Sequence, residues 1–150
     1  MSDERAAVLE VAELAKVAQR ELATATRATK DAALLAMAAA LRANTKEIET
    51  ANASDVADAK AGGTSAALID RLTLDTPRIE SLAAAVVAVA ALTDPIGEVI
   101  RGWRVPNGLQ INQIRVPFGV VGMIYEARPN VTVDAAALGY VGAKIGRAHV

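Results

Sequence analysis

The sequence predicts an incomplete α/β fold, in which a helical region is followed by a β-hairpin and then by a single buried strand. Three observations support this prediction. Apolar residues recur at helical spacing through roughly the first 92 residues. Residues 97–117 contain β-branched residues in alternation on both sides of a Pro-Asn-Gly turn. The run FGVVGMIY, residues 118–125, is then apolar on both faces, as expected for a parallel strand covered on both sides.

Residues 1–94 are expected to form helices that pack closely. Hydrophobic residues make up 53% of the chain, but aromatic residues make up only 3%, so small side chains dominate the core. Ser2 can cap a first helix, which ends before the threonine-rich stretch that begins at Thr24. A second helix then continues to a boundary at Asn44.

Three further helices are expected after that boundary. Ser54 can cap the first of them, which stops at the glycine pair beginning with Gly62. Residues 65–72 form the next. Pro77 marks the start of the last, because proline in the first turn lacks an N–H group that would be unpaired there.

Residues 95–116 are expected to form a hairpin around the turn at residues 106–108. Ile114 and Val116 fall out of phase with the apolar residues earlier in the second arm. This shift predicts either a β-bulge or a strand that leaves the hairpin to join another sheet. Trp103 is expected to be a packing or subunit-contact residue.

The polar turn from Tyr125 to Asn130 is the strongest candidate site. Ligands of open α/β sheets bind beyond the carboxyl ends of the strands, where this turn lies. Arg128 precedes a proline, which favours an extended backbone, and Asn130 offers an amide donor at the mouth of the next helix. The arrangement suits stabilisation of an oxyanion. From the residues alone, a plain helix cap is the favoured interpretation of Asn130, and Thr132 can also cap this helix.

Gly119 and Gly122 lie inside the expected strand rather than in a G-x-G-x-x-G turn after it. They therefore do not form a dinucleotide fingerprint, and we expect them to allow close backbone packing.

Composition excludes several function classes. The net charge of −1, from 16 basic and 17 acidic residues, predicts no nucleic-acid partner. No apolar run approaches membrane-spanning length and the start is too charged for a signal peptide, so a cytoplasmic protein is expected. The absence of cysteine excludes disulfides, thiolate metal sites and a cysteine nucleophile within the chain, and no other metal motif is present.

The 23-residue run VPFGVVGMIYEARPNVTVDAAAL, residues 116–138, closely resembles the first cofactor-domain strand and turn of γ-glutamyl phosphate reductase. Residues 49–75 and 94–122 are similar to the same family. The motifs GWRVPNGL and YEARPNVTVDAAAL are together a highly specific signal.

The resemblance implies an aldehyde-dehydrogenase-like fold and the NADPH-dependent reduction of L-glutamyl 5-phosphate to glutamate 5-semialdehyde, with release of phosphate, in proline biosynthesis. In this family a cysteine forms a thioester that hydride then reduces. The resemblance assigns to Asn130 the donation of a hydrogen bond to the oxyanion. It places Tyr125, Glu126, Arg128 and Pro129 near the nicotinamide end of NADP. It also implies a homo-oligomer that associates through the hairpin.

Residues 1–138 are therefore expected to be the N-terminal part of the cofactor-binding domain, inactive alone because the nucleophile is missing. The helical region covers residues 1–94, the oligomerisation hairpin 95–116, and the first cofactor-sheet strand and turn 117–138.

Residues 139–150 depart from the family pattern. The end, Ile145–Val150, is what a widely used sequencing adapter encodes when it is read through in one frame. We expect this tail not to be native, and His149 then has no functional role.

Two alternatives remain. A non-catalytic helical interaction or oligomerisation module is favoured by the lack of cysteine if the chain is complete. A different aldehyde dehydrogenase is disfavoured, because ordinary members place an aromatic residue before the asparagine, where this chain has Pro129.

Overall fold

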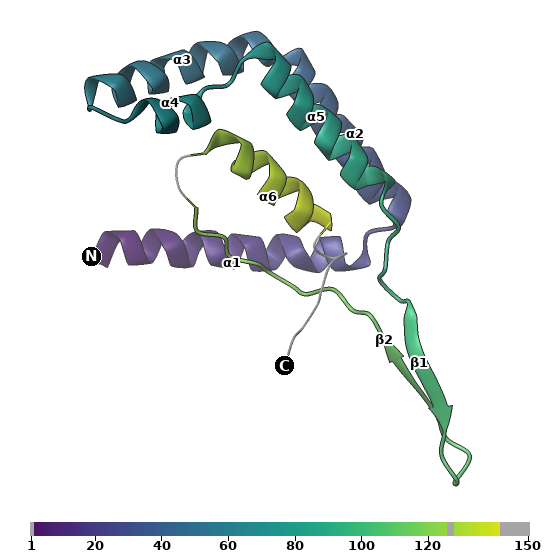
Figure 1. Cartoon of the computed structure of the whole chain (residues 1–150). Helices are drawn as coiled ribbons and strands as arrows, with labels where there is room; N and C mark the ends of the chain where they lie inside the picture. Colours follow the sequence, from purple (N-terminus) through teal and green to yellow (C-terminus); the bar gives the residue numbers. More distant parts are fainter. Residues whose placement is uncertain (1, 126–127, 142–150) are drawn as a thin grey trace. The chain divides into compact units, whose positions relative to one another are not determined.

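The computed structural model describes residues 2–125 and 128–141 of the chain (Figure 1). Its elements are α1 (Ser2–Thr24), α2 (Arg27–Ala43), α3 (Thr45–Ala61), α4 (Ala66–Leu72), α5 (Thr76–Ala91), β1 (Val99–Arg104), β2 (Gln110–Ile114) and α6 (Pro129–Val141). Glu126 and most of the tail expected to be non-native, including His149, lie outside the described residues. Among the helices that are described, none is long and apolar enough to cross a membrane.

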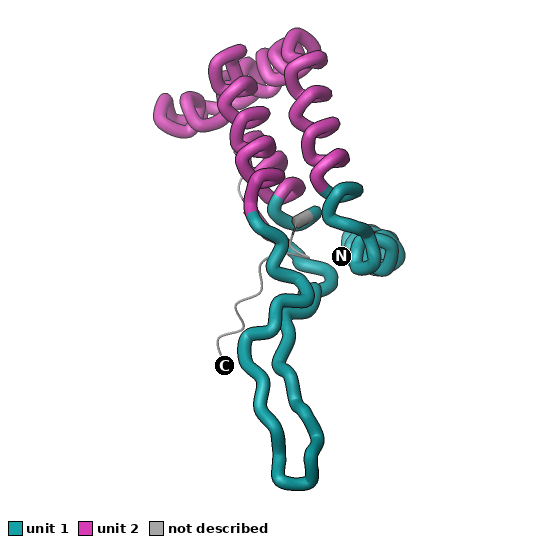
Figure 2. The backbone as a smooth tube through the Cα atoms, turned by 90° about the vertical axis from the view of Figure 1, so that its right-hand side faces the viewer, with its two compact units in different colours: residues 1–30, 93–122, 138–150 teal, residues 31–92, 123–137 magenta. Residues whose placement is uncertain are grey.

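The chain divides into two compact units (Figure 2). Unit 1 comprises residues 1–30, 93–122 and 138–150, and unit 2 comprises residues 31–92 and 123–137.

The predicted break between the first two helices is confirmed. α1 ends at Thr24, and the hydroxyl oxygen of Thr26 accepts a hydrogen bond from the backbone N–H of Thr29 at 3.2 Å. This bond satisfies one of the N–H groups that the first turn of a helix leaves free. Thr26 therefore acts as the cap of α2.

The expected helix cap at Ser54 is wrong, because Ser54 lies inside the continuous helix α3. The residue before α3 is Asn44, which makes no side-chain cap hydrogen bond. A single serine costs a helix interior only about 0.5 kcal/mol relative to alanine, so the good helix formers on both sides carry the helix through it. The predicted end at Gly62 and Gly63 is confirmed, and Gly63 has a φ of +78°.

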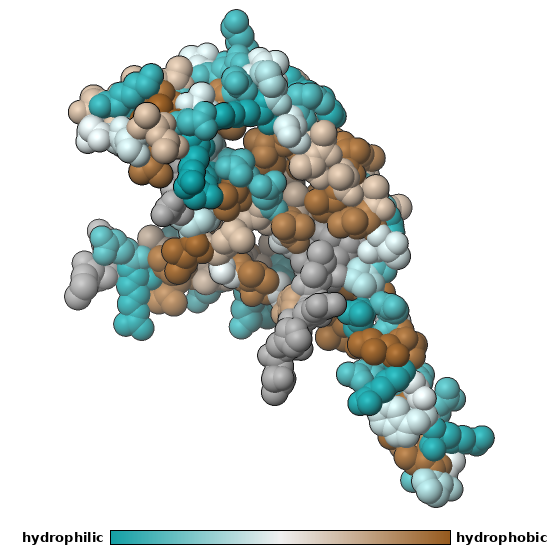
Figure 3. Space-filling view, in the orientation of Figure 1, coloured by the Kyte–Doolittle hydropathy of each residue, from teal (hydrophilic) through white to brown (hydrophobic). Residues whose placement is uncertain are grey.

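The predicted hairpin in unit 1 is confirmed as the antiparallel pair of β1 and β2. Gly108, with a φ of +87°, makes the turn. The register shifts between Val99 and Arg101, so the hairpin contains a bulge in which Ile100 is the extra residue. This bulge lies in the first arm, opposite Ile114, rather than in the second arm, where the phase shift predicted it. The Arg101 guanidinium lies 5.3 Å from the centre of the Trp103 ring, on the same face of β1. Every residue of β1 is exposed, and hydrophobic side chains interrupt the polar surface of the hairpin (Figure 3).

A buried ion pair ties the start of α2 to the segment that leads into the hairpin. The ammonium of Lys30, only 2% exposed, lies 3.8 Å from the Asp94 carboxylate. The other carboxylate oxygen of Asp94 accepts a hydrogen bond from the Ile96 N–H at 3.1 Å. Both contacts lie within unit 1.

The buried strand expected at residues 118–125 does not form in this chain. Gly119 has a φ of +96°, and the side chains of Val121 and Ile124 are 63% and 103% exposed. A strand that is apolar on both faces needs neighbours in a sheet, and the sheet of the described residues contains β1 and β2 alone. The expected close packing at Gly119 and Gly122 is also wrong, because a Cβ atom added at either meets nothing within 4 Å.

Unit 2 is built around one face of α5. The carboxylate of Asp75 caps this helix by accepting a hydrogen bond from the Arg78 N–H at 2.9 Å, and Pro77 lies in the first turn, as predicted. The buried apolar residues among those described are Leu34, Ala38, Ile79, Leu82, Ala83, Val86, Ala90 and Ala137. Most of them lie on α5 at helical spacing, so α5 organises this core.

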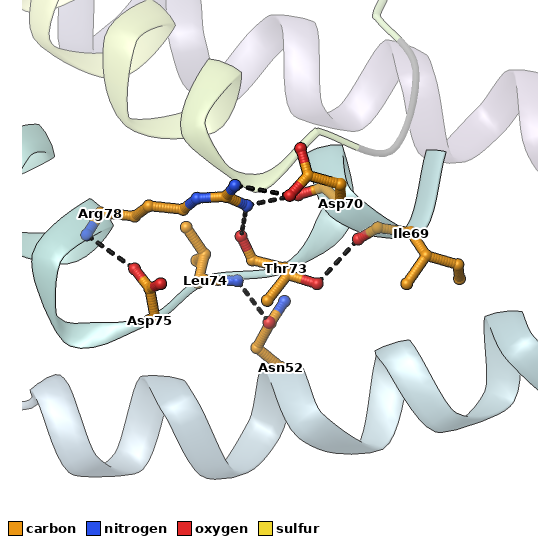
Figure 4. Close-up of polar contacts among 7 residues, drawn as sticks. All are labelled: Asn52, Ile69, Asp70, Thr73, Leu74, Asp75 and Arg78. Atoms are coloured by element: carbon orange, nitrogen blue, oxygen red, sulfur yellow. Dashed lines mark hydrogen bonds and ion pairs between the residues drawn. The ribbon is translucent and has the colours of Figure 1, made fainter. Parts of the chain in front are cut away.

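A buried amide side chain joins α3 to the connection between α4 and α5. Asn52 is 6% exposed. Its Nδ2 donates to the Leu72 carbonyl at 2.9 Å, and its Oδ1 accepts from the Leu74 N–H at 2.6 Å (Figure 4 shows the second bond). One side chain therefore holds the connection at two backbone points.

We predict that Asn52→Ala lowers the free energy of unfolding by roughly 1–3 kcal/mol, because two backbone groups lose their partner. Urea unfolding followed by circular dichroism measures this loss. Asn44→Ala is the matched control, since the Asn44 amide donates to the Ala40 carbonyl from an exposed position. Equal losses in the two variants would contradict a special role for Asn52.

The ion pair between α2 and α5 predicts a pH dependence. The Arg42 Nε donates to Glu80 at 2.9 Å, and this hydrogen bond holds the pKa of Glu80 below its usual value. Because the pKa is lower in the folded state, the pair stabilises the fold above the unfolded pKa, and this contribution is lost as the pH falls through the folded pKa. The urea midpoint of Glu80→Gln should lie slightly below that of the wild type at neutral pH and coincide with it in acid. The difference is small because the pair is exposed. A difference that persists in acid would disprove this explanation.

The exposed segment 118–125 predicts self-association of the isolated chain. Ile124→Lys should reduce light scattering at a given protein concentration, because it places a charge in the most exposed apolar position of the segment. Ser54→Lys adds the same charge on an exposed part of α3 and serves as the control. A comparable improvement in both variants would show that net charge, rather than this segment, controls association.

Candidate functional site

Unit 2 contains a cleft of about 560 Å³ formed by the α4–α5 corner, α5 and the start of α6. Its lining is rich in charged side chains. The lining residues are Asp70, Arg71, Thr73, Leu74, Arg78, Ser81, Leu82, Ala85, Arg128, Asn130 and Asp134. Arginines outnumber aspartates in this set, so the cleft suits an anionic ligand better than a cationic one.

The start of α6 brings Asn130 into the cleft without using it as a cap. Pro129 is the first residue of α6, so Arg128 precedes the helix and Asn130 is its second residue. The expected capping by Asn130 or Thr132 is therefore wrong, because Pro129 moves the helix start ahead of both. The structure describes no hydrogen bond from the half-buried Asn130 side chain. Its amide is available to a ligand in the cleft.

The residues predicted to contact the cofactor are only partly brought together. Arg128 lines the same cleft as Asn130, whereas Tyr125 and Pro129 do not line it. The Tyr125 side chain is 45% exposed, and its hydroxyl lies 2.7 Å from the hydroxyl of Thr132. That contact fixes the aromatic ring against the first turn of α6.

Arg78 fastens the wall of the cleft (Figure 4). Its guanidinium donates to the Asp70 carboxylate at 2.7 Å, to the Thr73 carbonyl at 2.8 Å and to the Asp70 carbonyl. The hydrogen bond with the Asp70 carboxylate raises the pKa of Arg78 above its ordinary value. Arg78 is therefore committed to holding the end of α4 against the start of α5.

Sequence reasoning missed Asn52, Asp70, Arg71 and Arg78. Asn52, Asp70 and Arg71 lie within residues 49–75, the stretch similar to the reductase family, and Arg78 follows it closely. The similarity marked this stretch without distinguishing its members. Their roles depend on pairing across the α4–α5 corner, for which a single sequence gives no periodic signal.

A second cleft, in unit 1, has no charged side chain that could bind a ligand or take part in a reaction. Its volume is about 230 Å³. It is lined by Gln19 and by small or apolar residues of α1, by residues 119–121, and by Gly139 and Tyr140. We therefore do not regard it as the candidate site.

Comparison with known proteins shows that the chain is similar to γ-glutamyl phosphate reductases. It is 60% identical over 132 residues to γ-glutamyl phosphate reductase of Kineococcus radiotolerans, covering 88% of this chain and 31% of that protein. It is 56% identical over 138 residues to the same enzyme of Thermobifida fusca, covering 92% of this chain and 33% of that protein. The resemblance to γ-glutamyl phosphate reductase is confirmed. No family model matches the chain.

Solved structures of γ-glutamyl phosphate reductase confirm the predicted fold class. The Thermotoga maritima enzyme matches with a TM-score of 0.87 and 41% identity, covering 90% of this chain and 33% of that one. The Saccharomyces cerevisiae enzyme matches with a TM-score of 0.84 and 32% identity, covering 90% and 34%. The chain thus spans about a third of the length of the γ-glutamyl phosphate reductases that it matches.

Proposed function

We propose that this chain is the N-terminal portion of a γ-glutamyl phosphate reductase. The full enzyme would reduce L-glutamyl 5-phosphate to L-glutamate 5-semialdehyde with NADPH and release phosphate, as a step of proline biosynthesis. The observation that carries the proposal is the position of Asn130. Its side-chain amide lines an arginine-rich cleft and is not consumed by helix capping.

In this proposal Asn130 donates a hydrogen bond to the acyl oxygen of the substrate as negative charge develops on it. A donor mounted on a helix is already oriented, so little reorganisation is needed during the reaction. The chain contains no cysteine, so we assign the attacking thiolate to a part of the enzyme outside this chain. Displacement of phosphate by that thiolate leaves a thioester, and the acyl oxygen bears the charge in between.

The residues around the start of α6 suit the nicotinamide end of NADPH. Arg128 supplies a positive charge at the cleft, and the exposed ring of Tyr125 offers an apolar face whose orientation the contact with Thr132 fixes. Pro129 fixes the backbone at the start of α6. We include Glu126 as a fourth contact on the resemblance alone. When it is bound, NADPH supplies the hydride.

The hairpin supports assembly of the full enzyme as a homo-oligomer. β1 is exposed along its whole length, and Trp103 is 43% exposed. Exposed apolar surface of this kind is typical of protein contacts. The same observation is what favours the alternative of a non-catalytic oligomerisation module.

The test is Asn130→Ala in the enzyme translated from the full reading frame. We expect turnover to fall roughly 10²–10³-fold, about 3–4 kcal/mol, with little change in the dissociation constant of NADPH. Steady-state kinetics and quenching of NADPH fluorescence measure the two quantities. Asn44→Ala, an exposed asparagine outside the cleft, is the control and should retain full turnover.

Unchanged turnover in Asn130→Ala would contradict the proposed function. Parallel losses in turnover and NADPH binding would show that Asn130 is structural and contributes no oxyanion donor.

A further inference from the structure

We propose that Arg71 binds an oxyanion of the substrate, either a phosphate or a carboxylate group, in the cleft of unit 2. The inference rests on the proposed function, because it names the part of the acyl phosphate that the cleft recognises in addition to the acyl oxygen.

Two arginines of the α4–α5 corner line the cleft, and their surroundings differ. The guanidinium of Arg78 has three protein oxygens as acceptors, from Asp70 and Thr73. Arg71 lies in the last turn of α4, and the structure describes no hydrogen bond or ion pair for its side chain. Arg78 is therefore a fastening residue, and Arg71 is the cation of this corner that is available to a ligand.

The neighbouring acid does not neutralise Arg71. The carboxylate of Asp70 is 2.7 Å from Arg78, which already provides its counter-charge. Successive residues on a helix also point in different directions, so Asp70 and Arg71 do not face each other. The positive charge of Arg71 is therefore left for a ligand. With Arg78 and Arg128, Arg71 is one of three arginines in the same lining.

The corner that carries Arg71 is held rigidly. Asn52 fixes the backbone at Leu72 and Leu74, which lie one and three residues after Arg71 in the connection to α5. A fixed backbone reduces the entropy lost on binding. The planar guanidinium group matches two oxygens of a carboxylate or phosphate at once, which an ammonium cannot do. The Ser81 hydroxyl, on α5, lines the same cleft and can donate a further hydrogen bond.

The test is steady-state kinetics of the full-length enzyme run in the direction that consumes phosphate, with Arg71→Gln. Arg71→Gln removes a hydrogen-bonded cation. It should therefore raise the KM of the substrate that Arg71 binds about 10- to 100-fold, with a much smaller change in kcat. A rise in the KM of inorganic phosphate assigns Arg71 to the phosphate, and a rise confined to the KM of the semialdehyde assigns it to the carboxylate. Arg20→Gln, an exposed arginine on α1, is the matched control and should change neither KM.

Unchanged values of both KM would overturn the inference. If Arg71→Gln does not fold, Arg71→Lys takes its place. Lysine keeps the positive charge but cannot bind two oxygens at once in the way a guanidinium does, so the KM of the substrate that Arg71 binds should rise several-fold. No rise in that KM would overturn the inference. A large turnover loss in Asn130→Ala with no effect at Arg71 would reject this inference and leave the proposed function standing. Unchanged kinetics in both variants would reject the two together.

Discussion

The connection between α4 and α5, held on one side by Asn52 and on the other by Arg78, is the constraint on which the site depends. Asn52 is buried and satisfies one carbonyl and one N–H group of this connection. Arg78 closes it from the cleft side through Thr73 and the end of α4. Buried backbone groups that lose such partners cost the full penalty of desolvation, so this corner has one favourable arrangement. That arrangement keeps Arg71 in the lining of the cleft.

The rest of unit 2 supports the corner. α5 contributes most of the buried apolar side chains among the described residues, and its capped first turn joins the corner directly. The helix is therefore both the centre of the core and one wall of the cleft. α6 closes the other side, and Pro129 at its first position sets where Asn130 lies on the helix. The packing of α5 in the core thus also sets the geometry of the cleft.

Local chemistry in the sequence was enough to predict the helices and the hairpin. Threonines near residue 26 and the Pro-Asn-Gly turn act within a few residues, so a single sequence reveals them. The predicted cap at Ser54 failed because one serine is outweighed by its helical neighbours. The strand at residues 118–125 failed because strands need hydrogen-bonding neighbours, and the described residues supply none for this segment. The chain spans about a third of the length of the reductases that it matches.

The candidate site was predictable only in part. Asn130 could be proposed as a site residue because it ends the polar turn that follows the apolar run of residues 118–125. Asn52 was not, because its partners lie 20 and 22 residues away and its amide looks like any other helical asparagine. Arg71 and Arg78 are equally ordinary in sequence. Only the pairing of Arg78 with Asp70 distinguishes the fastened arginine from the available one.

The most direct measurement is a crystal structure of the full-length enzyme with a phosphonate analogue of L-glutamyl 5-phosphate. The account predicts the acyl oxygen of the analogue within hydrogen-bonding distance of the Asn130 amide and one of its anionic groups on the Arg71 guanidinium. An analogue bound outside this cleft, with the Asn130 amide bonded to the protein instead, would contradict it.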